Sequence, residues 1–420
     1  MTSPPSATGL TPAIAEGLRA AARRFGTPAY VTDLAALETA CSAVVAAFPD
    51  PWVRQYSVKA NDVPAIIAAV AARGFGANVV SRGEWAAASV AGVPNERITL
   101  EGIGKTPADL RAAARAARDG RPLRWVALES PEEAEALAGY VGSGPRLDVL
   151  YRLNPDVVPE TLAGLAVGAG VSKFGMDETE IGAAITAGGG PDGPLRSRGI
   201  HLHVGSQLGA VDAWREAVRK ALAVTALWRG SIATFDTLDV GGGFPVRPAD
   251  EPAPTAERFA REWPAILEGV PADRRPTRLA IEPGRALVAR SGWLLARVLH
   301  VRDRGGRQVI LDAGMTELIR PMLYNAYHRI EPAETRQAPE VLSDVVGPLC
   351  ESSDTLGKDR RFPKPEVGDV FAVLDAGAYG SVMASNYNRR SLPAEVMVQN
   401  GRAAVIRRRQ TIDDMLALEI

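Results

Sequence analysis

The sequence predicts an α/β protein made of a TIM-type (β/α)₈ barrel and a C-terminal, mainly β domain with a Greek-key-like arrangement. Two observations predict it. From about residue 50 to residue 285, β-rich apolar runs alternate with alanine-rich stretches that have helical spacing. Beyond residue 285, strand-like runs joined by short turns replace this alternation. An open doubly wound sheet is the alternative for the first part.

Eight β-rich runs supply the predicted barrel strands. Alternating β and α elements favour a parallel sheet, and eight of them match a closed barrel. The runs are RQYSVKAN, FGANVVS, RITL, LRWVALES, RLDVLYRLN, GIHLHVGS, FDTLDVGGG and RLAIEPGR. We therefore assign residues 35–285 to the barrel domain.

Hairpin signals define the second domain. Gly305 and Gly306 separate two apolar runs, and Asn400 and Gly401 stand at the turn of AEVMVQNGRAAVIRRR. PAYVTD, near residue 30, also reads as a strand with this domain as its candidate partner. We assign residues 1–34 and 286–420 to the β domain.

Composition excludes several classes of function. The 48 Lys and Arg residues nearly balance the 49 Asp and Glu residues, which gives no support for a nucleic-acid partner. Two cysteines, Cys41 and Cys350, are too few for a disulfide framework or a thiolate metal site. Four histidines offer no evident metal ligand set, so no metal is expected. We see neither a secretory signal nor an apolar run of about 18 residues, which predicts a cytoplasmic protein without a membrane partner.

Lys59 is a candidate nucleophile at the end of the first predicted strand. The period-two alternation puts Ser57 and Lys59 on one face, directed toward the barrel interior. Desolvation there would lower the pKa of an amine and free its lone pair to form a Schiff base. The alternative is an ordinary surface lysine.

Polar residues end three further strands. His203 follows an apolar strand face and has a flat ring that can stack on a planar cofactor. Gly241, Gly242 and Gly243 offer backbone N–H groups to a phosphate, although they could equally form only a turn. Glu282 precedes a Pro-Gly break and could keep a pyridine nitrogen protonated. Together with a Schiff-base lysine, these are the components of a pyridoxal 5′-phosphate (PLP) site.

Nine ordered motifs resemble the fold type III (alanine-racemase-fold) PLP-dependent decarboxylases, and within that family the diaminopimelate decarboxylases. They extend from about residue 23 to residue 410. The motifs are YSVKAN, SRGEW, SKFG, HVGSQ, DVGGGFP, EPGR, DAGMTELIRPMLYNAYH, VVGPLCESSD and DAGAYGSVMASNYNRR.

The resemblance implies a role for each matched residue. Lys59 would carry PLP covalently, His203 would stack on its ring, and Cys350 would donate the proton. The other implied cofactor residues are Ser206, Gly241, Gly242, Gly243, Glu282, Gly284, Arg285 and Tyr379. The implied substrate residues are Arg285, Arg320, Tyr324, Glu351 and Tyr379. The resemblance also implies a homodimer with shared active sites, in which Cys350 and Glu351 serve the partner subunit.

The implied reaction converts meso-diaminopimelate into L-lysine and CO₂ in lysine biosynthesis. Cys350 is followed by Glu351, whereas relatives that act on ornithine typically have Asp there. Arg285 and Arg320 also suit a substrate with a second carboxylate. Three segments depart from the usual family pattern: EGIGKT, NYNRRSLPAEV, and DVVPETLAGLAVGAG after Pro155. The alternatives are a paralogue acting on another or carrier-bound amino acid, an amino-acid racemase on the same fold, and a non-enzymatic PLP-binding protein.

Overall fold

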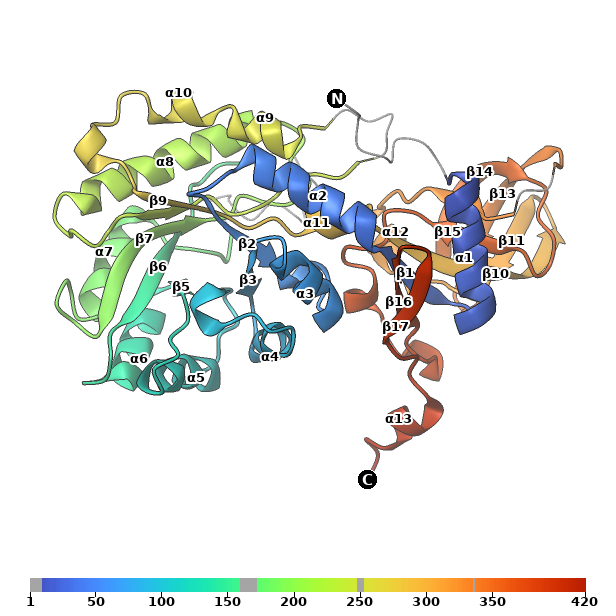
Figure 1. The fold of residues 1–420 in the computed structure, drawn as a ribbon, viewed down its shortest axis with the longest axis horizontal. Helices are drawn as coiled ribbons and strands as arrows, with labels where there is room; N and C mark the ends of the chain where they lie inside the picture. Colours follow the sequence, from blue (N-terminus) through green and yellow to red (C-terminus); the bar gives the residue numbers. More distant parts are fainter. Residues whose placement is uncertain (1–9, 159–171, 248–252, 335–336) are drawn as a thin grey trace. The chain divides into compact units, whose positions relative to one another are not determined.

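The computed structural model describes residues 10–158, 172–247, 253–334 and 337–420. The departing stretch DVVPETLAGLAVGAG lies mostly outside these residues. The chain forms two compact units, shown in Figure 1 with the sequence coloured from blue to red. The barrel unit consists of Cys41–Pro245 and Ala253–Gly284, and the β unit consists of the chain up to Ala40, Val246–Pro252 and Arg285–Ile420.

The barrel unit contains a closed ring of eight parallel strands, and each of the eight predicted runs supplies one of them. The first strand pairs with the last and closes the ring. Val53 lies opposite Ala280, and Arg54 lies opposite Ile281. This confirms the predicted barrel. The strands are β2 (Val53–Ser57), β3 (Gly76–Val79), β4 (Ile98–Leu100), β5 (Trp125–Leu128), β6 (Leu147–Leu153), β7 (Leu195–Leu202), β8 (Thr237–Asp239) and β9 (Arg278–Ile281).

Helices follow most of these strands, and local sequence signals set where several of them begin. Thr106 and Asp177 form capping boxes with acidic residues three positions later, which satisfies free backbone N–H groups at the helix start. The helices of the unit are α3 (Pro64–Ala71), α4 (Arg82–Val90), α5 (Pro107–Arg118), α6 (Pro131–Val141), α7 (Glu178–Ala187), α8 (Asp212–Arg229), α9 (Ala256–Ala260) and α10 (Trp263–Leu267).

Buried polar side chains, as well as apolar ones, fill the barrel interior. Thr99 donates a hydrogen bond to Gln55 at 2.6 Å, and Gln55 donates to Asp239 at 3.4 Å. All three side chains are buried, and they come from β2, β4 and β8. Because buried polar groups need partners, this network fixes the orientation of three strands of the barrel.

The β unit is built on one sheet with the strand order β14-β13-β11-β10-β1-β16-β17, and β15 pairs with both β10 and β12. β1 corresponds to the run predicted near residue 30, and it pairs with β10 and β16. The strands are β1 (Ala29–Asp33), β10 (Gly292–Asp303), β11 (Arg307–Leu311), β12 (Ile330–Pro332), β13 (Glu340–Val346), β14 (Thr355–Pro363), β15 (Val370–Val373), β16 (Ala394–Gln399) and β17 (Arg402–Arg407).

Both predicted hairpin turns occur at the predicted residues. Asn400 and Gly401 have φ of 50° and 72°, as a two-residue turn between β16 and β17 requires. Gly305, with φ of 66°, lies in the turn between β10 and β11. The remaining helices are α1 (Pro12–Phe25), α2 (Leu34–Ala47), α11 (Arg285–Val288), α12 (Arg320–Tyr324) and α13 (Ile412–Leu416).

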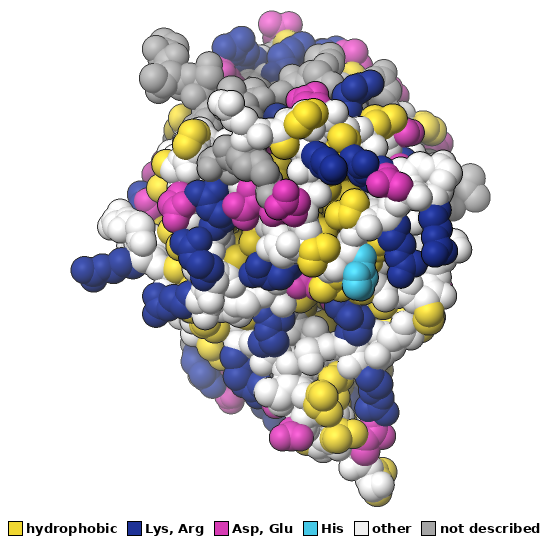
Figure 2. Space-filling view, turned by 90° about the vertical axis from the view of Figure 1, so that its right-hand side faces the viewer, with side chains coloured by type: hydrophobic (Ala, Val, Ile, Leu, Met, Phe, Trp, Pro, Cys, Tyr) yellow, Lys and Arg dark blue, Asp and Glu magenta, His cyan; other side chains and the backbone are white. Residues whose placement is uncertain are grey.

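One face of the molecule is mixed in character. The face in Figure 2 carries lysine and arginine side chains interspersed with acidic and apolar ones. Among the helices of the described residues, none combines the length and apolar character that a membrane crossing needs.

Candidate functional site

Lys59 lies in a short 3₁₀ turn, Val58–Ala60, and not on the strand face that the alternation predicted. β2 ends at Ser57, so the chain turns before the lysine. The Lys59 side chain keeps 34% of its surface exposed, which makes it half-buried and not fully desolvated.

The end of β9 holds the Lys59 turn in place. Ser57 donates its backbone N–H to Pro283 at 3.1 Å and its hydroxyl to the Glu282 carbonyl at 3.0 Å. Gly284 packs so closely that an added Cβ would lie 3.0 Å from the Ser57 Cβ and 3.2 Å from the Ala60 Cβ. The segments that carry Lys59 and Glu282 are therefore joined by hydrogen bonds.

Three buried ionisable side chains lie in a row that begins at Lys59. Glu101, which follows β4, accepts from the Lys59 Nζ at 3.2 Å and lies 3.1 Å from the His201 Nε2. The same Nε2 lies 3.3 Å from Glu282, to which Asn78 also donates a hydrogen bond. Lys59, Glu101, His201 and Glu282 thus form a continuous chain of charged contacts, which we call the lysine–carboxylate chain.

His201 is a cation in this chain. Burial disfavours the imidazolium, but the carboxylates of Glu282 and Glu101 outweigh it and raise the pKa of His201 to about 10. The potential ligand atoms of Glu101, His201 and Glu282 lie within 4.8 Å of one another, as a metal site would need. In the protonated ring Nε2 donates to the carboxylates.

The two carboxylates of the chain differ in their proton affinity. Burial opposes ionisation of Glu101, yet the charges of Lys59 and His201 hold its pKa well below the usual value. Burial and the negative charge of Glu101 raise the pKa of Glu282. Glu282 is buried at the end of β9, and a carboxylate beside a pyridine nitrogen keeps that nitrogen protonated, so Glu282 fits the nitrogen end of PLP.

His203 follows β7 and is held by the glycine loop. Its Nδ1 accepts the backbone N–H of Gly242 at 3.2 Å, which leaves Nε2 to carry the proton of a neutral ring. Burial and the positive charges of Lys59 and Arg152 hold the pKa of His203 well below its usual value. A neutral ring in a fixed orientation suits stacking on a planar cofactor.

Two backbone N–H groups of the glycine loop after β8 donate hydrogen bonds to side chains of the protein. Gly241 donates its N–H to Asp239 at 3.0 Å, and Gly242 donates to His203. An added Cβ would come within 2.3 Å of the Leu202 carbonyl at Gly241 and within 2.3 Å of the Glu282 carbonyl at Gly242. These two glycines are therefore required by close backbone packing. Ser206, on the loop after His203, is half-buried.

A pair of arginines forms the candidate substrate region of the β unit. Arg285 begins α11 and Arg320 begins α12, and both are buried. Their guanidinium carbons lie 4.7 and 5.8 Å from the ring centre of Tyr379, and that of Arg320 lies 5.6 Å from the Tyr324 ring. Four of the predicted residues therefore come together here.

The arginine pair has the properties of an anion site. Burial and the neighbouring charge of Arg285 lower the pKa of Arg320 to about 10. The Arg320 Nε is buried and has no hydrogen-bond partner among the described residues. Tyr379 has a φ of 55°, a conformation that side-chain-bearing residues rarely adopt. A carboxylate would offset both the burial and the repulsion of the two guanidinium groups.

Cys350 and Glu351 lie at the exposed surface of the β unit. Tyr387 donates its hydroxyl to Glu351, and the Asn388 side-chain nitrogen lies 3.5 Å from the Cys350 sulfur. The hydrogen bond and the negative charge of Glu351 raise the pKa of Tyr387. Asn388 and Tyr387 are polar neighbours that the sequence did not single out.

Glu101 was not identified as a site residue from the sequence. Of the two histidines in GIHLHVGS, the sequence favoured His203, not His201, as the candidate site residue. Glu101 directly follows the run RITL, so its position at a strand end was the available signal. His201 was visible in GIHLHVGS, but its two carboxylate partners lie on other strands.

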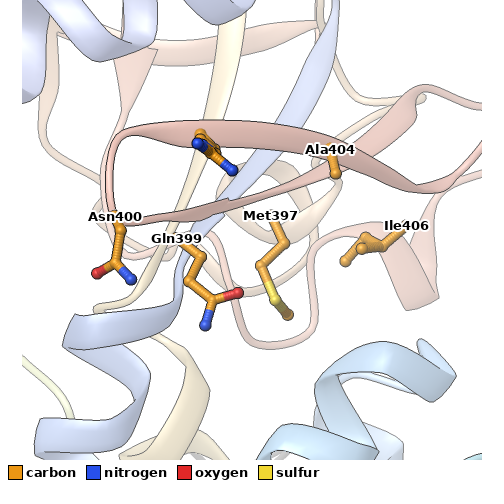
Figure 3. Close-up of a pocket in the computed structure, with 6 residues that line it drawn as sticks. Met397, Gln399, Asn400, Ala404 and Ile406 are labelled. Carbon is orange, nitrogen blue, oxygen red and sulfur yellow. The ribbon is translucent and has the colours of Figure 1, made fainter.

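A hollow beside the hairpin β16–β17 contains none of the predicted site residues (Figure 3). Apolar side chains, two side-chain amides and one guanidinium group line this hollow. The lining residues are Met397, Gln399, Asn400, Arg402, Ala404 and Ile406.

Comparisons with known proteins agree with this arrangement. Residues 34–289 match the model of the pyridoxal-dependent decarboxylase family, pyridoxal binding domain. The diaminopimelate decarboxylases of Aquifex aeolicus and Zymomonas mobilis are 38% and 37% identical to the chain, and each match covers 94% of it and 92% and 93% of the relative. The crystal structure of diaminopimelate decarboxylase from Helicobacter pylori complexed with L-lysine has a TM-score of 0.88 and 31% identity, covering 96% of this chain and 98% of that one.

Proposed function

Because the chain belongs to the pyridoxal-dependent decarboxylase family, we propose that it removes one carboxylate of meso-diaminopimelate to give L-lysine and CO₂. The reaction is a PLP-dependent carboxy-lyase step of lysine biosynthesis. Its cofactor is PLP, which supplies an electron sink for the electron pair that departing CO₂ leaves behind.

The barrel unit would hold the cofactor. In this proposal Lys59 binds it covalently, Glu282 pairs with its ring nitrogen, and the neutral His203 covers one face of its ring. Ser206, the glycines after β8 and Gly284 would serve the phosphate end, and the family resemblance adds Arg285 and Tyr379 of the β unit as cofactor residues. The pairing with Glu282 is supported by its burial at the end of β9, because a buried carboxylate beside the ring nitrogen would keep that nitrogen protonated and positive.

The arginine pair is the single observation that carries the substrate assignment. Arg285 and Arg320 are both buried next to Tyr379. A diamino acid with one carboxylate would spend that carboxylate in the reaction, whereas diaminopimelate retains a second one for this pair to bind. Two planar guanidinium groups would hold it in a fixed direction, and Tyr324 would complete the contact.

Cys350 would donate the proton that replaces CO₂, and Glu351 would bind the amino group of the substrate. Both are exposed in the single chain, whereas a proton donor must be shielded from water to act selectively. We therefore include in the proposal a homodimer in which each subunit supplies Cys350 and Glu351 to its partner. A cytoplasmic location stays a prediction from the sequence, to be checked by cell fractionation.

Release of CO₂ from a panel of amino acids tests the substrate. We expect turnover of meso-diaminopimelate and at least about a hundredfold lower kcat/KM for L-ornithine and L-lysine, because neither offers the arginine pair a second carboxylate. Arg320→Met should remove most of this preference. Equal turnover of L-ornithine and meso-diaminopimelate, or racemisation without CO₂, would contradict the assignment.

Trapping of the cofactor tests the role of Lys59 independently of the substrate. The purified protein should absorb near 420 nm, about where protonated PLP Schiff bases absorb, and borohydride should fix the label on Lys59. Lys59→Ala should abolish both the absorbance and the label. Lys105→Ala, at the buried lysine that pairs with Glu133 at 3.0 Å, is the control and should keep the label. A label on another lysine would refute the assignment.

A further inference from the structure

Glu101 is a buried carboxylate whose position beside Lys59 the proposed function does not use. Its side chain is 4% exposed, and its Oε1 lies 3.2 Å from the Lys59 Nζ. Its other oxygen lies 3.1 Å from the His201 Nε2. Because His201 fixes Oε2, the remaining oxygen is directed at the lysine.

Other charged groups surround Lys59, and Glu101 is in direct contact with it. Burial raises the pKa of Glu84 to about 7. Glu101 stays ionised. The charged and titratable groups that act on Lys59 or on this carboxylate include Glu84, Glu282, Asp239, Arg152, His201 and His203.

We propose that Glu101 is the positioning residue that receives Lys59 as an ammonium group each time a substrate amine displaces it from the cofactor. This inference rests on the proposed covalent role of Lys59. In the exchange, the bond from the cofactor aldehyde carbon to Nζ breaks and a bond from that carbon to the substrate nitrogen forms. Two protons pass from the substrate ammonium group to Nζ, so no further reactant is consumed.

The geometry gives Glu101 a selective effect on this exchange. A displaced lysine has its full positive charge on Nζ, and a carboxylate at hydrogen-bond distance in a buried site stabilises that charge strongly. When Nζ is bonded to the cofactor, it has fewer protons to donate to Glu101. Glu101 therefore favours the substrate-bound state over the resting state, and it keeps the displaced lysine beside the site for the return step.

The first test measures the protonation of Lys59 in the full-length protein after the cofactor has been removed. Competitive acetylation across a pH series, followed by peptide mass spectrometry, gives the pH midpoint of Lys59 reactivity. Glu101→Gln should lower this midpoint by roughly one to three pH units, because a neutral amide no longer favours the ammonium form. Glu101→Asp should restore part of the shift.

The second test uses the cofactor-loaded protein and L-lysine as the probe. L-Lysine displaces Lys59 without losing CO₂ rapidly, and the change in absorbance reports the equilibrium. We expect Glu101→Gln to raise the L-lysine concentration for half-displacement by roughly tenfold, with partial recovery in Glu101→Asp.

Glu133→Gln is the matched control because Glu133 also pairs with a buried lysine of the barrel, Lys105, at 3.0 Å. It should change neither readout. An unchanged acetylation midpoint in Glu101→Gln, or an equal shift in Glu133→Gln, would overturn the proposal. The acetylation experiment needs no substrate, so a wrong substrate assignment would leave the shift of the acetylation midpoint unchanged. The same wrong assignment would abolish displacement of Lys59 by L-lysine.

Discussion

His201 places one positive charge between two buried carboxylates. Its Nε2 lies 3.1 Å from Glu101 and 3.3 Å from Glu282. Without that charge the barrel would hold two negative groups at close range, and one of them would have to take up a proton. The imidazolium therefore decides how protons are distributed over the lysine–carboxylate chain.

The pKa of His201 predicts how the stability of the barrel depends on pH. The pKa rises from an ordinary 6.5 to about 10 on folding, so the protein gains this stabilisation fully below about pH 6.5 and loses it as the pH approaches 10. At pH 6, His201→Gln should lower the free energy of unfolding by about 3 to 5 kcal/mol, as expected for a broken buried ion pair.

Urea unfolding of the cofactor-free protein at pH 6 and at pH 10 checks this. The difference between wild type and His201→Gln should become smaller at the higher pH. His300→Gln, at an exposed histidine, should have little effect at either pH. A constant difference for His201→Gln would show that packing, not charge, causes the loss.

At the residue scale, the sequence predicted the types of group in the site better than their partners. Lys59, His203 and Glu282 were identified because each ends a predicted strand. Glu101 contacts Lys59 across 42 positions of sequence, and such a contact has no local signal. The alternation also placed Lys59 on a strand face, but β2 ends at Ser57 and a 3₁₀ turn changes the direction of the side chain.

At the scale of elements, close backbone contacts hold the loops that carry the site. The Gly242 segment lies against the end of β9 so tightly that a Cβ would meet the Glu282 carbonyl at 2.3 Å. Gly242 also holds the His203 ring through its N–H. One residue without a side chain thus sets the spacing between two proposed cofactor contacts.

Gly242→Ala should therefore damage cofactor binding through the backbone. We expect a loss of about 1 to 3 kcal/mol in the free energy of unfolding, as is usual for overpacking, because the loop must move away from β9. The displaced His203 and Glu282 should weaken PLP affinity by at least about tenfold. Thermal unfolding and a PLP titration measure the two effects.

Gly104→Ala is the matched control because, apart from its immediate chain neighbours, no atom of the described residues lies within 4 Å of the added Cβ. It should leave both quantities nearly unchanged. Retention of full PLP affinity in Gly242→Ala would show that the loop adjusts without moving either contact.

Element types were largely predictable because their signals are local. The Asn400–Gly401 turn and the Gly305–Gly306 turn were identified from residues that tolerate positive φ. The order of the strands in the β unit was not predictable in this way. β1 pairs with β10 and β16, which lie more than 250 and 350 positions further along the chain.

At the scale of the whole molecule, the proposed dimer makes a prediction about mixed subunits. Lys59→Ala and Cys350→Ala should each be nearly inactive alone. If each active site takes Lys59 from one subunit and Cys350 from the other, a mixed dimer has one intact site. Equal mixing with free exchange should then restore about a quarter of wild-type activity.

Activity after co-expression and purification of the two variants, with mass determination in solution, checks this expectation. Mixing Lys59→Ala with Lys59→Arg gives no dimer with an intact site and serves as the control. A monomer in solution, or a mixture that stays inactive although mixed dimers form, would contradict the sharing of sites.

The position of the two proposed cofactor anchors has a consequence for folding. Lys59 follows β2 and Glu282 follows β9, and pairing of these two strands completes the ring. A ligand fixed to both residues would link the beginning of the barrel to its end, more than 220 residues later in the chain. Such a link opposes separation of β2 from β9. The barrel without cofactor would therefore open between these two strands more readily than the barrel with cofactor bound.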